Sequence, residues 1–281
     1  MPPISRTHAG RRLDRLLLLA LALFTLMAVA GYAVFGRDPS RLASLPQWAL
    51  TFYARSFAFF ALGHVIVAMA VLAVVLTRRV GARWLPAFAT LYVISLSSEL
   101  AGTTWGLPFG EYSYSELLAP MWLDRVPAVI PMSWFFMALP SYALAALAVP
   151  GRGARIAVSS LILLAWDLAL DPAMSFATPY WTWGESGPYY GMPWLNLVGW
   201  YVTGIVLALM LALLRAERWT SRVEPRWWLG FYGVNLALPL GMCMAAGLWL
   251  AVGATAVVLA VLAASLTLAV RHTAQSAARL A

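Results

Sequence analysis

Three carboxylates lie within apolar segments of this 281-residue chain. Glu99 follows the apolar run 89–98, and Asp167 and Asp171 lie within the run 161–172. An ionisable group at the centre of a membrane helix costs roughly 2.5–3.5 kcal/mol, which makes such a group a functional candidate. The i, i+4 spacing of Asp167 and Asp171 places both side chains on one helix face. These three acids are therefore the first candidates for catalysis.

The grouping of these acids predicts proton-transfer chemistry. Two neighbouring carboxyls in a medium of low dielectric constant cannot both be ionised at low cost, because burial and mutual repulsion both oppose the charge. We expect the group to share a proton, which it can donate while keeping a compensating negative charge. Such a site suits protonation of an alkene, because the faces of Trp and Tyr rings stabilise the resulting cation.

The composition predicts an integral membrane protein, since 62% of the residues are hydrophobic and only 11% are charged. Soluble domains carry about 25% charged residues. Most of the apolar runs approach the ~20 residues that a helix needs to cross a bilayer. We expect an all-α, polytopic bundle of about eight transmembrane helices, at residues 13–35, 48–76, 84–102, 127–149, 154–171, 193–214, 228–248 and 253–270.

The arginines predict how this bundle is oriented. All 19 basic residues are Arg, and 15 of them lie before the first span or after the second, fourth, sixth and eighth. The other connections carry only Arg37, Arg41 and Arg125. Under the positive-inside rule this alternation places both termini in the cytoplasm, in a multi-pass protein of the cell membrane. Because the arginines lie in short loops, we expect no nucleic-acid partner. We expect a single transmembrane domain over residues 1–281.

This topology brings the acids into one layer near the outer face. The spans 84–102 and 154–171 run outward and carry the acids towards their outer ends, while 48–76 and 193–214 run inward from the same layer. The outer loops 102–114 and 178–191 are rich in Gly, Pro, Trp and Tyr and contain no basic residue. We expect the substrate-binding residues to be Arg55, Tyr114, Trp134, Trp166, Trp181, Trp183 and Asn196.

Other chemistries have less support from the residues. A membrane prenyltransferase binds Mg²⁺ and diphosphate through two Asp-rich motifs, whereas Asp167 and Asp171 form one sparse motif with no second copy. A zinc site needs several His or Cys ligands, and His64 is the only histidine near the acids. We therefore expect no metal and no cofactor. A proton-coupled transporter and another isoprenoid enzyme, such as a cyclase, remain alternatives, although no inverted repeat is visible.

Several motifs around the acids resemble one known family, the membrane carotenoid 1,2-hydratases of the CruF type. The similarity covers about residues 95–205, the family-like core, while the outer spans match only as apolar helices. The segments that carry it are ELAG at 99–102, GLPFGEYSY at 106–114, VPAVIPMSW at 126–134, WDLALDP at 166–172, YWTWG at 180–184 and YYGMPWLN at 189–196.

The resemblance implies a hydro-lyase of carotenoid biosynthesis. Its members add water across the terminal C1–C2 double bond of an acyclic, lycopene- or γ-carotene-like end group and form a tertiary alcohol. The implied partners are this substrate, water, membrane lipid and other carotenoid enzymes, with no cofactor. We expect Asp167 or Asp171 to protonate the alkene, and Glu99, Asn196 or Tyr114 to orient the water.

Overall fold

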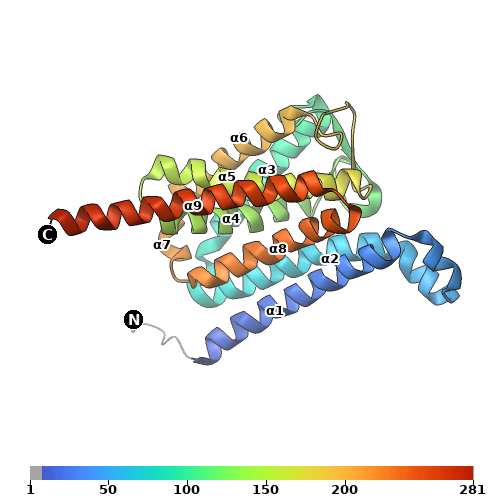
Figure 1. Ribbon diagram of the computed structural model, residues 1–281, viewed down its shortest axis with the longest axis horizontal. Helices are drawn as coiled ribbons and strands as arrows, with labels where there is room; N and C mark the ends of the chain where they lie inside the picture. Colours follow the sequence, from blue (N-terminus) through green and yellow to red (C-terminus); the bar gives the residue numbers. More distant parts are fainter. Residues whose placement is uncertain (1–7, 281) are drawn as a thin grey trace.

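Long helices dominate residues 8–280, which the computed structural model describes (Figure 1). Short helical turns join several of them: η1 (Tyr32–Gly36), η2 (Pro39–Ser44), η3 (Gly81–Trp84), η4 (Glu116–Leu118), η5 (Pro172–Phe176) and α7 (Glu217–Thr220). The long helices are α1 (His8–Gly31), α2 (Gln47–Val80), α3 (Leu85–Trp105), α4 (Ile130–Ala148), α5 (Arg152–Asp171), α6 (Trp194–Leu213), α8 (Pro225–Ala246) and α9 (Trp249–Leu280).

Six helical stretches within the described residues are long and apolar enough to cross a membrane, which indicates a membrane-embedded protein. One of them, Gln47–Trp105, is 59 residues long and contains both α2 and α3, separated by η3. The apolar part of α9, Trp249–Ser265, is shorter than the other stretches. The eight-span count and the orientation of the termini stay predictions.

The outward faces of the helices are apolar. On α1, for example, Leu19, Leu23 and Leu26 expose 54%, 53% and 63% of their surface, while Leu21 is fully buried. Large exposed aliphatic side chains at helical spacing suit contact with lipid, which is as apolar as the side chains themselves. The exposed apolar surface of the bundle is therefore explained by a bilayer around it.

The centre of the bundle is formed by α4 and α5. Two-thirds of the apolar stretch in α4 is buried, the highest share of the six stretches, and α5 packs against α4 and α6. The approach of α5 to α6 depends on Gly204, where a Cβ would lie only 2.5 Å from the Ser160 hydroxyl oxygen. Small residues at such contacts let membrane helices pack closely. The Asp-bearing helix α5 is thereby fixed at the core.

The connections between helices contain four short strands, which differ from the all-α expectation. Strand β1 (Tyr112–Tyr114) pairs antiparallel with β4 (Trp181–Trp183), and β2 (Met121–Trp122) pairs with β3 (Val126–Pro127). In the first pair Tyr112 lies opposite Trp183 and Tyr114 opposite Trp181. These aromatic residues favour strands, but their partners come from a distant loop. The pairing of the two loops is therefore a tertiary feature.

Figure 1 shows that α1 begins and α9 ends at one end of the bundle. The loops that follow α3 and α5 lie at the other end. The turn before α9 is at Gly247, which has a φ of +74°, a conformation that favours glycine. Gly253, where the predicted last span begins, lies inside α9.

The orientation of the bundle can be tested by cysteine labelling. The only cysteine, Cys243, is buried, so the unmodified protein should react poorly with a membrane-impermeant maleimide. We expect Ser186→Cys, exposed in the loop after β4, to be labelled in intact cells. Ala154→Cys, exposed near the start of α5, should be labelled only after permeabilisation. The reverse pattern would contradict the predicted topology.

Candidate functional site

Glu99 is the centre of a dense group of hydrogen bonds at the end of α3. Its side chain is buried, and its Oε1 accepts a hydrogen bond from the indole Nε1 of Trp134 at 2.7 Å. Its Oε2 accepts hydrogen bonds from the hydroxyls of Tyr112 and of Tyr114, the latter at 2.9 Å. Both carboxylate oxygens are thus satisfied by donors from other segments, as a buried acid requires.

The two aspartates of α5 share one donor. The Nδ2 of Asn196, on α6, donates to Oδ2 of Asp171 and lies 3.3 Å from Oδ2 of Asp167. The indole Nε1 of Trp181 donates to the other oxygen of Asp171 at 3.1 Å. Asp167 is fully buried, and within the described residues its Oδ1 has no hydrogen-bond partner. An amide nitrogen that reaches both carboxyls places the two acids side by side.

The β1–β4 sheet covers Glu99 and Asp171 with aromatic side chains. Because side chains alternate along a strand, Tyr112 and Tyr114 project from the same face of β1, and Trp181 and Trp183 from the matching face of β4. The Tyr112 and Trp183 ring centroids are 5.5 Å apart, and those of Tyr114 and Trp181 are 5.8 Å apart. The tyrosines bind Glu99 and Trp181 binds Asp171, so this sheet joins the two acidic positions.

Two glycines let the loop after α3 fold back over Glu99. Gly106 ends the helix with a φ of +70°, in the left-handed region that glycine adopts at helix ends. At Gly102, a Cβ would lie only 2.8 Å from the Tyr112 hydroxyl oxygen. A larger residue there would push Tyr112 away from Glu99.

Tyr112 and Tyr114 lie outside the membrane-spanning stretches and are held as neutral donors. Burial raises the pKa of both phenols well above the usual value, and the adjacent Glu99 carboxylate raises it further. Neither phenol ionises at physiological pH under these conditions. Each neutral hydroxyl can therefore donate to the Glu99 carboxylate or to a group that replaces it.

A small cavity of about 40 Å³ lies between the acids and the aromatic side chains. Glu99 and Asp171 both line it, together with Asn196 and Ser133. A water molecule needs about 10–15 Å³ by this measure and two to four polar partners. The cavity can hold water, and it is too small for a large hydrocarbon group.

The structure brings most of the sequence-predicted residues together here. Asp167 is set one turn of α5 behind Asp171 and is linked to the cavity through Asn196. Whether these residues act in catalysis or binding stays a prediction. The predicted residues that line the cavity are Glu99, Asp171, Tyr114, Trp134, Trp181, Trp183 and Asn196.

Trp166 and Arg55 are not at this cavity, contrary to our expectation. The indole of Trp166 turns towards α8, donates to the carbonyl oxygen of Asn235 at 3.3 Å and packs on the Trp200 ring. Arg55 is exposed on α2, on the face opposite the residues that α2 turns inward. The rotation of α2 directs the Arg55 side chain away from the acids.

Sequence reasoning also missed residues that contact the acids. Tyr112 donates directly to Glu99, and its i, i+2 spacing from Tyr114 in a loop was the available signal of a strand. Trp200 stacks on Trp134 with centroids 4.0 Å apart, although its position on α6 carried no distinguishing pattern. His64 lies elsewhere, within 3.3 Å of the Thr25 hydroxyl and 3.1 Å of the Asn235 amide oxygen.

These features define a helical membrane protein with buried carboxyls beneath an aromatic sheet. A family model described as carotenoid biosynthesis protein matches residues 60–262, and the chain belongs to this family. It is also similar to the bisanhydrobacterioruberin hydratase of Haloarcula japonica, with 37% identity over 128 residues. That match covers 44% of this chain and 43% of the relative, so this chain spans less than half of the length of the relative. No solved structure gives a significant match.

The donors on β1 can be tested for their contribution to stability. Tyr112→Phe or Tyr114→Phe leaves Glu99 buried with one donor fewer, which should lower the free energy of unfolding by about 1–3 kcal/mol. Ser113→Ala is the matched control, because this residue lies between them and is exposed, and its effect should stay within about 0.5 kcal/mol. Equal thermal stability of all three variants in detergent would exclude the donor role.

Proposed function

We propose that the protein is a carotenoid hydratase in the cell membrane. It adds water across the terminal C1–C2 double bond of an acyclic carotenoid end group and produces a tertiary alcohol. The family match and the hydratase relative support the reaction class and the type of substrate. The observation that carries the proposal is that Glu99 and Asp171 share one small cavity beneath four Tyr and Trp rings.

In the proposed mechanism Asp171 gives its proton to C2 of the alkene. Its position on the cavity favours it over Asp167, which has no contact with the cavity. Protonation at C2 breaks the π bond, forms a C–H bond and leaves a tertiary cation at C1. The rings of Tyr114, Trp181 and Trp183 offer π faces to this cation. General acid catalysis of this kind contributes about 10²–10⁴-fold to a rate.

Glu99 holds the negative charge that the cation requires. Its three donors can satisfy a carboxylate in a site from which bulk water is excluded. A water molecule in the cavity attacks C1 and forms the C–O bond, and Glu99 accepts the proton it releases. This proton then passes across the cavity to Asp171, which restores both groups. The cycle consumes one alkene and one water and requires no redox step.

Four polar residues in the mainly aromatic wall of the cavity favour hydration over cyclisation. A cyclase protonates the same type of alkene but must keep water from the cation. Here Glu99, Asp171 and Asn196 border a space large enough for water, and the Ser133 hydroxyl, which donates to the Ile130 carbonyl oxygen, can still accept a hydrogen bond. Such a lining supplies the partners that position a nucleophilic water, which supports a hydratase.

The acids can be tested in bacteria that make lycopene. Expression of the wild-type protein should yield pigment whose mass has increased by one water, with a tertiary hydroxyl. Asp171→Asn and Glu99→Gln should lower the conversion by about 100-fold or more, because each removes a proton-transfer group while keeping its shape.

Asp124→Asn makes the same chemical change at an exposed residue and serves as the matched control. Full conversion by Asp171→Asn, at equal amounts of protein in the membrane, would remove Asp171 from the mechanism. Asp167→Asn should have a smaller effect, because Asp167 reaches the cavity only through Asn196. Pigment of unchanged mass but altered absorption would indicate a cyclase or an isomerase.

Chelation separates the hydratase from a metal-dependent prenyltransferase. No step of the proposed reaction uses a metal ion, so EDTA should leave the conversion of lycopene by purified membranes unchanged. A prenyltransferase that binds Mg²⁺ and diphosphate would lose its activity and regain it on addition of Mg²⁺. Loss of hydration in EDTA, restored by a divalent cation, would contradict the metal-free mechanism.

A further inference from the structure

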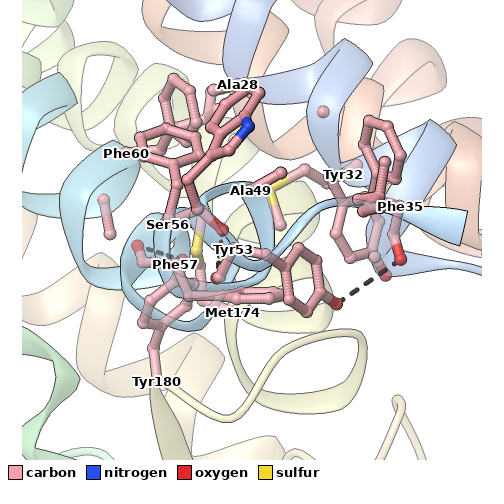
Figure 2. Close-up of a pocket in the computed structure, with 18 residues that line it drawn as sticks. Ala28, Tyr32, Phe35, Ala49, Tyr53, Ser56, Phe57, Phe60, Met174 and Tyr180 are labelled. Atoms are coloured by element: carbon pink, nitrogen blue, oxygen red, sulfur yellow. Dashed lines mark hydrogen bonds between the residues drawn. The ribbon is translucent and has the colours of Figure 1, made fainter. Parts of the chain in front are cut away.

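A second, larger cavity is lined by Tyr180, in the segment that leads into β4 beside the acid site (Figure 2). Its volume is about 370 Å³, within the usual range of about 300–1,000 Å³ for ligand pockets. It is enclosed by α1, η1, α2, η5 and α8, and eight of its 18 lining residues are aromatic. None of the residues that line it also lines the acid cavity.

The few polar groups of this pocket are occupied by the protein itself. The Tyr180 hydroxyl donates to the carbonyl oxygen of Phe57 at 2.9 Å, and Tyr32 donates to that of Ala177 at 3.2 Å. The Ser56 hydroxyl donates to the carbonyl oxygen of Tyr53 at 2.7 Å. Because these hydroxyls already have acceptors, the pocket offers little to a polar head group and suits a hydrocarbon.

The pocket reaches the lipid-facing surface near the start of α2. Trp48 and Phe52 line it, yet they expose 74% and 51% of their surface. Large exposed aromatic side chains in this part of a membrane protein face lipid or the membrane interface. A hydrophobic molecule dissolved in the bilayer can therefore reach the pocket without crossing water.

The inner wall of the pocket separates it from the acids by a single layer of residues. Tyr180 lines the apolar pocket, whereas the next residue, Trp181, lines the acid cavity and donates to Asp171. Met174, three residues after Asp171, also lines the apolar pocket and points into it in Figure 2. The same short segment thus contributes to both spaces.

We propose that this apolar pocket binds the conjugated hydrocarbon chain of the isoprenoid substrate while the end group is presented to Asp171 and Glu99. This inference rests on the proposed function. The acid cavity, at about 40 Å³, cannot hold the chain, and the adjoining pocket is the apolar, aromatic space that can. Because Tyr180 lines the apolar pocket and the adjacent Trp181 lines the acid cavity, the end group reaches the acids along this segment.

Filling the pocket tests this assignment. Gly31 lines it, and a Cβ added there would meet nothing within 4 Å, so Gly31→Phe fills space without a clash at the backbone. Gly253→Phe is the matched control, a helical glycine with equally open surroundings outside the pocket. A second pair on α2 is Ala61→Phe, which lines the pocket, and Ala54→Phe, which is exposed and does not.

Binding and turnover are measured separately. Lycopene is titrated into each purified variant in detergent, and its binding is followed by quenching of tryptophan fluorescence. Hydrated pigment is measured in lycopene-producing cells. Gly31→Phe and Ala61→Phe should each weaken lycopene binding by about tenfold or more and lower the hydrated pigment, while both controls match the wild type. Where one filled variant fails to fold, the other pair decides.

Wild-type binding and hydration by both filled variants would overturn the pocket assignment. A second result would also overturn it: a saturated fatty acid binds to the pocket as tightly as lycopene does, and the filled variants still hydrate lycopene. The pocket would then be a lipid site. A wild-type protein that binds lycopene through this pocket but hydrates no carotenoid would instead contradict the proposed function.

Discussion

The site depends on one constraint: a carboxyl group removed from water must find its hydrogen-bond donors within the protein. A buried acid without such donors costs several kcal/mol, a large part of the stability of a typical domain. Glu99 receives three donors, and Asp171 receives two. None of these donors lies on the same helix as the acid it satisfies. The need to satisfy the acids therefore fixes how loops and helices assemble around them.

The same donors shape the chemical surroundings of the acids. Tyr and Trp side chains donate through a hydroxyl or an indole N–H and leave their ring faces free to form a wall. The β1–β4 sheet thus serves two purposes, because it satisfies Glu99 and Asp171 and surrounds the cavity with π faces. Under the proposed function, the groups that hold the acids also stabilise the cation that the acids create.

The sequence predicted most of the helices and the grouping of the acids because both leave local signals. Hydrophobic runs gave most helices within a few residues, and the scarcity of acids in them singled out Glu99, Asp167 and Asp171. The predicted layer of residues also grouped Asn196 with the aspartates, and their shared hydrogen bonds confirm this grouping. A predicted layer does not give the rotation of a helix, however: Arg55 is exposed, and Trp166 turns towards α8.

The strand pairing could not be predicted for a different physical reason. Strands β1 and β4 are each three residues long, and each becomes stable only against the other, about 70 residues away in the chain. No local pattern encodes that partner, so Tyr112 was missed although it donates to Glu99. The apolar pocket beside Tyr180 was missed as well, because a cavity depends on how α1, α2 and α8 pack and not on any one segment.

The central claim is that a protein carboxyl protonates C2 and that water supplies the hydroxyl. The most direct measurement is hydration of lycopene by purified membranes in D₂O, followed by NMR and mass analysis of the product. We expect one deuterium bound to carbon at C2 beside the new tertiary alcohol at C1. A hydroxylated product without carbon-bound deuterium would contradict it, because the alkene would then have been functionalised without protonation.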